Sequence, residues 1–353
     1  KNIDQEKIKH NTYKYKKNIL ENFNKNIKEI NPKTILVKKD NNAFYKCEIY
    51  LENCVIYDIL DNDLIQLLEG ELIKKKINYQ FIGQNTDLNY LSLKQDKNIQ
   101  NFLKTTIFFD KGIDLEVDQN KNIITINQKD IGARAYIING SLEDTTIIFN
   151  GVGVSKDVVP PNYPIDAKGL TGCLSLINLN LNNINISATN SNCEDSVNLI
   201  NSSGTVNKIF IKNSYSDALD VDFSKLVFNQ IDVLNANNDC ADFSYGKYSL
   251  SNLKLDNCGD KAVSIGETSD VKIMNIKINK AKIGIATKDS SSLKLKGASI
   301  NYIDTCLSAY NKKQEFAGAY IKVTQTECKN FSKKFKKDNL SEIIFDNNRI
   351  KKN

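Results

Sequence analysis

Three aspartates in the second half of the chain, Asp195, Asp217 and Asp239, recur at one fixed spacing, and Lys261 takes the next position of the series. Side chains that repeat at one structural position stack on each other. Carboxylates about 5 Å apart repel, which raises some of their pKa values or recruits a cation. Ca²⁺ takes six to eight oxygen ligands and suits such a group. We therefore treat the three aspartates as candidate calcium ligands, with calcium as the only cofactor that the sequence indicates.

Two structural explanations compete with calcium. Lys261 would neutralise the end of the series without any further role. Aspartates in tight bends also cap backbone groups with their own side chains. The spacing alone is compatible with all three explanations.

The residues after these aspartates alternate as in a β-strand. Two positions of the repeat are mostly apolar: Val197, Leu219, Ala241, Val263, Ile285 and Leu307 at the first, and Leu199, Val221, Phe243, Ile265, Thr287 and Ala309 at the second. The position between them carries Asn198, Asp220, Asp242, Ser264, Ala286 and Ser308. Alternation of this kind predicts a strand with one face inward, and its fixed period predicts that each unit lies on a copy of itself.

The period of this repeat is the spacing from Asp195 to Asp217. A repeat of this length fits one coil of a parallel β-helix and is too short for a pair of helices. A second apolar strand in each coil supports this fold, as in Ile209 with Ile211 and Ile231 with Val233. Leucine-rich repeats would need a leucine consensus that the chain lacks. The coils resemble the right-handed parallel β-helix of the pectate-lyase-like superfamily, which includes polysaccharide lyases, epimerases, hydrolases and phage tailspikes. We therefore expect an all-β solenoid, although a fold does not by itself imply a chemistry.

The resemblance implies a few catalytic devices. Lyases and epimerases abstract a proton with Lys, Arg, His or Tyr, and hydrolases use paired carboxylates. The only histidine, His10, and the two arginines, Arg134 and Arg349, lie outside the repeats. What remains is Lys261 as a base near an aspartate-held cation, with Asp220 and Asp242 as the alternative acid and base. Side chains expected to contact sugar are Tyr245, Glu267, Lys288 and Tyr310.

The chain divides into three parts by pattern. Residues 1–105 predict a small α/β region, with helical stripes before Pro32 and over 61–72, and strands at 34–38, 43–50 and 78–83. Residues 106–330 predict the β-helix. Residues 331–353 form a basic C-terminal tail. Asn213, Asn235 and Asn257 predict an inward ladder of amides at one turn.

Eight cysteines form an even set that predicts disulfides and an oxidising compartment. Cys306 and Cys328 are separated by one period of the repeat and are expected to stack on adjacent coils. Cys173 with Cys193, and Cys240 with Cys258, are expected to straddle a corner, and Cys47 with Cys54 to close a small loop. Burial of unpaired cysteines in small core sites is the competing explanation.

Charge distribution narrows the choice of partner. The net charge is +6, but residues 192–270 hold 12 acidic side chains and 6 lysines, so this face disfavours nucleic acid. No apolar run is long enough for a transmembrane segment. We expect an exported protein, extracellular, periplasmic or on the cell surface, that acts on a polysaccharide or cell-surface glycan. A non-catalytic glycan-binding or adhesive module is the alternative, and the sequence gives no oligomeric state.

Overall fold

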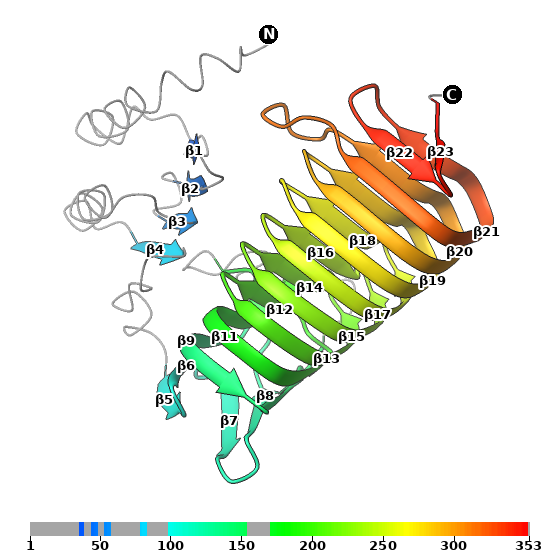
Figure 1. Ribbon diagram of the computed structural model, residues 1–353. Coiled ribbons are helices and arrows are strands. Elements are labelled where there is room, and N and C mark those ends of the chain that lie inside the picture. The colour runs from blue at the N-terminus through cyan, green and yellow to red at the C-terminus, as the bar shows by residue number, and fades with distance from the viewer. Residues whose placement is uncertain are drawn as a thin grey trace, which may run out of the picture. The chain divides into compact units, whose positions relative to one another are not determined.

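The computed structural model describes residues 98–153 and 170–351, together with the backbone of four strands nearer the N-terminus. In these ranges the chain forms a parallel β-solenoid of about nine coils, with a spacing of about 22 residues and no helix. Figure 1 shows the coils stacked along one axis from green to red. The predicted solenoid is confirmed. Among the described residues, no helix has the length and apolar character needed to cross a membrane.

Each central coil contains a short first strand and a longer second strand. The first strands are β12 (Asp195–Ile200), β14 (Asp217–Asp222), β16 (Ala241–Ser244) and β18 (Lys261–Gly266). The second strands are β13 (Ser203–Ser214), β15 (Lys225–Ala236) and β17 (Lys247–Cys258). In β11 (Gly172–Thr189), β19 (Asp270–Lys288), β20 (Ser292–Tyr310) and β21 (Tyr320–Lys337), both kinds belong to one continuous strand.

Stacking in register places the apolar columns in one core. Val197 pairs with Leu219 and Leu199 with Val221, and the same columns continue through Phe243 and Val263. All of these side chains are fully buried. Each large apolar side chain buried in this way contributes about 1.5–3 kcal/mol. The assignment of these columns to the interior is confirmed.

The N-terminal end of the solenoid lies before residue 106. β5 (Asn98–Phe102) and β6 (Thr105–Phe109) form an antiparallel hairpin, and β6 pairs with β9 (Ala135–Glu143). β7 (Ile113–Asp118), β8 (Ile123–Gln128) and β10 (Thr146–Asn150) complete this end. The compact unit that contains the solenoid therefore starts at residue 97. Phe102 is fully buried in its core, which explains why the hairpin belongs to it.

The C-terminal end extends past residue 330. β21 continues to Lys337, and β22 (Glu342–Phe345) and β23 (Asn348–Arg349) follow. β22 pairs with β21, and Ile343 is fully buried. The stretch expected as a basic tail is therefore part of the last coils up to Arg349, because its apolar side chains extend the core.

Four strands belong to the N-terminal unit: β1 (Ile35–Lys38), β2 (Phe44–Glu48), β3 (Asn53–Tyr57) and β4 (Asn78–Ile82). They form one sheet in this order. The three strands predicted from the sequence are present, and β3 was not predicted. The two predicted helices lie outside the described residues, and so do the side chains of Cys47 and Cys54.

The asparagine ladder is present but lies at the surface. Asn213 donates to Asn190, Asn235 to Asn213 and Asn257 to Asn235, at 2.9–3.0 Å between side-chain atoms. These residues are exposed or half-buried, so the expected inward position is wrong. All four have positive φ, which asparagine tolerates better than most residues at a sharp corner.

Among the described residues, three disulfides join Cys173 to Cys193, Cys240 to Cys258 and Cys306 to Cys328. The three pairings are as expected, but the expected reason for the last one is wrong. The coil that runs from Ser292 to its register partner Tyr320 is longer than the preceding coil, which runs from Asp270 to Ser292. This extra length places Cys328 in register with Ile300, so the bond to Cys306 crosses the interior.

Replacement of an inward and an outward valine by the same residue tests this arrangement. Val221 is fully buried and Val227 is 40% exposed. Val221→Asp should lower the free energy of unfolding by about 3 kcal/mol or more, because it buries an unpaired charge, and Val227→Asp should change it by less than about 0.5 kcal/mol. Denaturant unfolding of both variants measures the difference. Equal losses would contradict the inward and outward assignment.

Candidate functional site

Carboxylates gather on the outward side of the first strands. Asp220 and Asp242 are register partners on β14 and β16, and each follows a residue of the core. Asp222 points outward as well, and these three aspartates are partly exposed, whereas Asn198 and Ser264 on the flanking strands are buried. The middle of this side is therefore acidic and partly open to solvent. We call the following residues the acidic face: Glu194, Asp195, Asp217, Asp220, Asp222, Asp239 and Asp242.

Two members of the repeating series bind the backbone of the next coil. Asp217 Oδ1 accepts a hydrogen bond of 2.7 Å from the Asp239 N–H, and Asp239 Oδ1 accepts one of 2.9 Å from the Lys261 N–H. Hydrogen bonds of this kind satisfy donors at the turn where the first strand begins. The structural role considered from the sequence is thus present for Asp217 and Asp239, in a form that links coils.

Lys261 neutralises the end of the series. Its ammonium lies 3.2 Å from Asp239 and 2.5 Å from Asp260. Burial alone would lower the pKa of Lys261, but these two carboxylates raise it above its usual value. Lys261 therefore keeps its proton, which opposes the role of a base that was expected for it.

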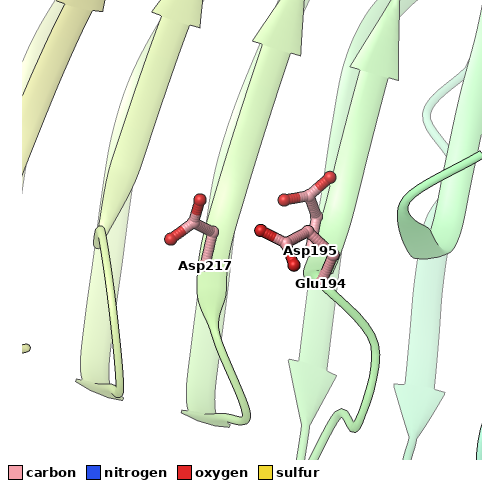
Figure 2. Close-up of side chains that lie close together, drawn as sticks. All are labelled: Glu194, Asp195 and Asp217. Atoms are coloured by element: carbon pink, nitrogen blue, oxygen red, sulfur yellow. The ribbon is translucent and has the colours of Figure 1, made fainter. Parts of the chain in front are cut away.

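The cluster best placed to hold a cation differs by one residue from the expected set. Carboxylate oxygens of Glu194, Asp195 and Asp217 all lie within 4.8 Å of one another, as Figure 2 shows. Asp239 is outside this group and binds Lys261 instead. Glu194 was missed because its counterparts in the next two coils, Ser216 and Asn238, are not acidic. Its place directly before Asp195, at the same turn, was the available signal.

Burial and mutual repulsion raise the pKa values of this face. The pKa of Asp217 rises to about 8, through burial and then Asp239, and that of Asp239 to about 6, through burial and then Asp242. The pKa of Asp222 rises to about 7, through burial, Asp242 and Glu267. Burial and then Asp217 raise the pKa of Asp195 well above the usual range, and burial and then Asp222 do the same for Asp220. Several of these groups therefore keep protons near neutral pH.

A chain of alternating charges borders the open middle. Lys313 binds Glu267 at 2.6 Å, and Lys288 lies 3.7 Å from Asp242. The two lysines outweigh burial and lower the pKa of Glu267, and Asp242 and Glu267 likewise raise the pKa of Lys288. Gly266 makes room for Lys288, because a Cβ there would lie only 3.1 Å from Lys288 Cε. The structure thus brings Glu267 and Lys288 to Asp242, as the sequence analysis expected of residues in one site.

Aromatic rings flank the same region. Tyr245 stacks on Phe223 with 4.5 Å between ring centroids, and the ring of Phe316 lies 6.5 Å from it. Phe316 belongs to the segment 311–319, which folds back so that Ala317 bonds Ser290. Tyr310 is half-buried and in register with Lys288. Both tyrosines expected to contact sugar therefore border the acidic face. The stacking of Phe223 on Tyr245 was not predicted.

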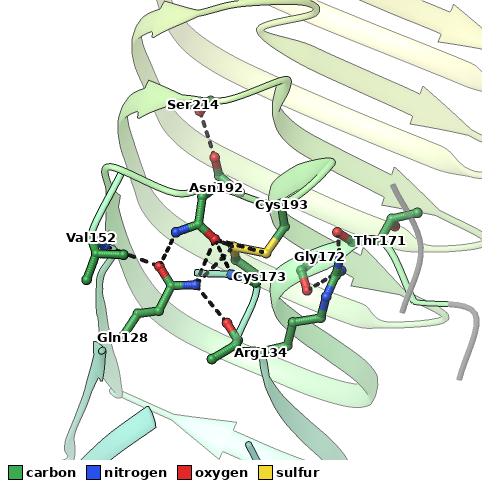
Figure 3. The surroundings of a disulfide bond; sticks show 12 residues. Gln128, Arg134, Val152, Thr171, Gly172, Cys173, Asn192, Cys193 and Ser214 are labelled. Carbon is green, nitrogen blue, oxygen red and sulfur yellow. Dashed lines mark hydrogen bonds between the residues drawn. A yellow bond between two sulfur atoms is a disulfide. The ribbon is translucent and has the colours of Figure 1, made fainter. Parts of the chain in front are cut away.

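A buried polar pair and a disulfide hold the turn that carries Glu194 and Asp195. Figure 3 shows Gln128 and Asn192 facing each other beside the bond between Cys173 and Cys193. Gln128 Nε2 donates to Asn192 Oδ1 at 2.9 Å, and Asn192 Nδ2 donates to Gln128 Oε1 at 2.5 Å. Cys193 directly precedes Glu194. The disulfide and the Gln128–Asn192 pair therefore hold the residues directly before Glu194, where the candidate cation cluster begins.

Comparisons of the chain with protein-family models, with curated proteins and with solved structures find no match. The geometry of the acidic face is thus the basis for any statement about function.

The raised pKa of Asp222 predicts how stability depends on pH. The folded protein holds this proton up to about pH 7, whereas a carboxyl of pKa 3.8 has lost it far below. The stabilising contribution is therefore complete below the unfolded pKa and is lost as pH rises through about 7. Thermal unfolding should show a decline in Tm from about pH 4 to about pH 7 that is shallower in Asp222→Asn. Asp304→Asn, on an exposed residue, is the control and should leave the slope unchanged.

Proposed function

We propose that this protein is extracellular and cleaves a polysaccharide at the acidic face, with Asp220 as the acid and Asp242 as the partner carboxylate. The observation that carries the proposal is the pair itself: two carboxyl groups in register on adjacent strands, in surroundings of different charge. Catalysis of glycosidic bond cleavage by two carboxyl groups needs one protonated and one ionised member. The charges beside the two groups differ: Lys288 lies next to Asp242, whereas Asp222 acts on Asp220.

Asp220 suits the acid. Burial and the neighbouring Asp222 raise its pKa well above the usual range, so it holds a proton near neutral pH. Asn198 donates a hydrogen bond of 2.9 Å to Asp220 Oδ2 and orients the carboxyl group. Proton donation to the oxygen of a leaving sugar is what such a group does.

Asp242 suits the second role, that of nucleophile or base. The Lys288 ammonium, 3.7 Å away and itself almost fully buried, supplies a fixed positive charge beside it. In the proposed reaction Asp242 attacks the sugar or activates water. Glu267, whose charge together with that of Asp242 raises the pKa of Lys288, helps to keep that ammonium protonated.

Proton abstraction by Lys261 has less support than the carboxylate pair. Its ammonium is bound by Asp239 and Asp260, and its raised pKa opposes loss of the proton. A lyase or epimerase based on Lys261 would first have to break both ion pairs. For this reason the two-carboxylate mechanism is preferred.

Calcium is proposed at Glu194, Asp195 and Asp217. Only 2% of Asp195 is exposed, and its Oδ2 has no hydrogen-bond partner among the described residues. Such an oxygen, beside two other carboxylates, fits the hard oxygen ligands that Ca²⁺ prefers. Bound there, a divalent cation would offset the repulsion between these carboxylates. Extracellular placement is supported by the three disulfides, which persist in oxidising compartments.

Glycan binding without catalysis is the second candidate. The stacked rings of Phe223 and Tyr245 support it, because aromatic side chains hold sugar rings whether or not the protein is an enzyme. Glycan binding of this kind needs the two rings, but it does not need Asp220 and Asp242 to have different surroundings.

Release of reducing ends from a panel of polysaccharides tests the catalytic proposal. Asp220→Asn and Asp242→Asn should each lower kcat by about 10²–10⁴-fold on a cleaved glycan, because each removes a proton-transfer or charged group. Asp232→Asn, on the second strand β15, is the matched control and should retain activity. A wild type that binds a polysaccharide but releases no reducing ends from it would support the second candidate. Unsaturated ends, seen by absorbance, would instead support a lyase.

Calcium titration tests the cation site separately. Ca²⁺ at about 100 times its Kd should add about 2.7 kcal/mol to the free energy of unfolding, because it binds the folded state only. Asp217→Asn should abolish this gain, and Asp232→Asn should keep it. No effect of calcium on the calorimetric Tm of the wild type would remove calcium from the proposal and leave the carboxylate pair standing.

A further inference from the structure

A second charged surface lies on the second strands of the last coils. Lys272, Lys294 and Lys322 are register partners on β19, β20 and β21. Each stands between two buried apolar residues and is itself exposed, so all three point outward in one column. Neighbouring members are separated by about one strand spacing, ~4.8 Å. Figure 1 shows these strands as the broad yellow to red ribbons, on a different side of the coil from β14 and β16.

Other lysines reinforce the column, whereas Asp270 and Glu342 lie in the column on one side of it. Lys254 pairs in register with Lys277. Among the described residues, no carboxylate forms an ion pair with the three lysines of the column, and the nearby Glu327 is bound by Lys329 at 3.0 Å. We call the following exposed residues the lysine face: Lys254, Lys272, Lys277, Lys294, Lys296 and Lys322.

Stacked like charges work against the fold unless a partner offsets them. Like charges directly opposite each other on neighbouring strands are destabilising. Scattered lysines at a surface are ordinarily just solvated, but a column in register concentrates positive charge along a line. A polyanion that follows this line would neutralise several ammonium groups at once and release its own counterions.

The shape of the column favours a linear polymer with regularly spaced anionic groups. The line runs across the strands, along the solenoid axis, and offers one ammonium per coil. Duplex nucleic acid carries its phosphates on two curved backbones and would touch a straight column only locally. Single-stranded nucleic acid is held by aromatic stacking as well as by charge. The two columns beside the lysines offer one ring between them, Tyr320: they are Met274, Lys296 and Thr324 on one side and Asp270, Ser292 and Tyr320 on the other. Lysine, as a flexible point charge, also suits sulfate and carboxylate groups without a fixed orientation.

We propose that the lysine face binds an extended polyanionic glycan and so attaches the protein to an anionic surface polymer. This surface is separate from the acidic face, whose negative charge disfavours a polyanion. The inference does not rest on the proposed reaction. It assigns the two charged sides of the solenoid to two different ligands.

Binding to immobilised dextran sulfate, with uncharged dextran as the reference, tests the inference on the full chain. The triple variant Lys272→Gln, Lys294→Gln, Lys322→Gln should bind roughly tenfold to hundredfold more weakly at low salt. The slope of log affinity against log salt should fall by about two to three. The matched control is Lys104→Gln, Lys111→Gln, Lys121→Gln, which removes the same charge from exposed lysines near the N-terminal end of the solenoid. It should bind within about twofold of the wild type if the column is specific.

Three results would overturn the inference. They are equal losses in the two triple variants, no binding of the wild type to dextran sulfate, and tighter binding of single-stranded DNA than of dextran sulfate at the same salt. Thermal unfolding of each variant establishes that it is folded. Should the triple variant fail to fold, Lys294→Gln alone, compared with Lys111→Gln, gives the same comparison with a smaller expected loss. Polysaccharide cleavage and calcium binding should be unchanged in the lysine variants, so failure here is distinct from failure of the proposed function.

Discussion

Parallel stacking of coils in register is the constraint on which the rest of this structure depends. A backbone ladder between successive coils places each side chain about 4.8 Å from its counterpart, whatever its chemistry. Apolar columns such as Val197, Leu219 and Ala241 gain from this and form the core. Amides also gain, because each asparagine of the ladder can donate to the previous one. Carboxylates and ammonium groups do not gain, since the same spacing brings like charges together.

Charged columns are therefore the places where the structure shows compensation. Asp217 and Asp239 accept backbone N–H groups from the next coil, and Lys261 ends the series with two ion pairs. Lys288 reaches over Gly266 to Asp242, and Glu267 binds Lys313. Asp195 and Asp220 have no such cation, and burial raises their pKa values instead. The carboxyl groups of the acidic face therefore differ: some are bound by a lysine or a backbone N–H group, and others have a strongly raised pKa.

Segments that leave the repeat shape the rim of this face. The segment 311–319 lengthens one coil and returns over its neighbours, where Lys313 meets Glu267 and Phe316 meets Tyr245. At the other end, the disulfide at Cys193 and the Gln128–Asn192 pair fix the turn before Glu194. The repeat supplies rows of side chains, and the irregular parts give one region of those rows distinct surroundings. A functional site in a solenoid is accordingly expected where a row of repeated side chains meets an irregular segment.

The sequence by itself determined the repeat and the inward and outward positions of the first strands, because a fixed period specifies which residues become neighbours. It also indicated the three cysteine pairs, although the reason expected for Cys306 with Cys328 was wrong. It also indicated that Asp220, Asp242, Glu267 and Lys288 share one side. It did not show that Lys261 would be held by Asp260, that Glu194 would join Asp195, or that the asparagine ladder would face solvent. The boundaries expected at residues 105 and 330 were displaced as well, since the terminal strands depart from the repeat. The tertiary structure decided these points because they depend on side-chain orientation, on burial, and on contacts such as Lys313 with Glu267 that no period relates.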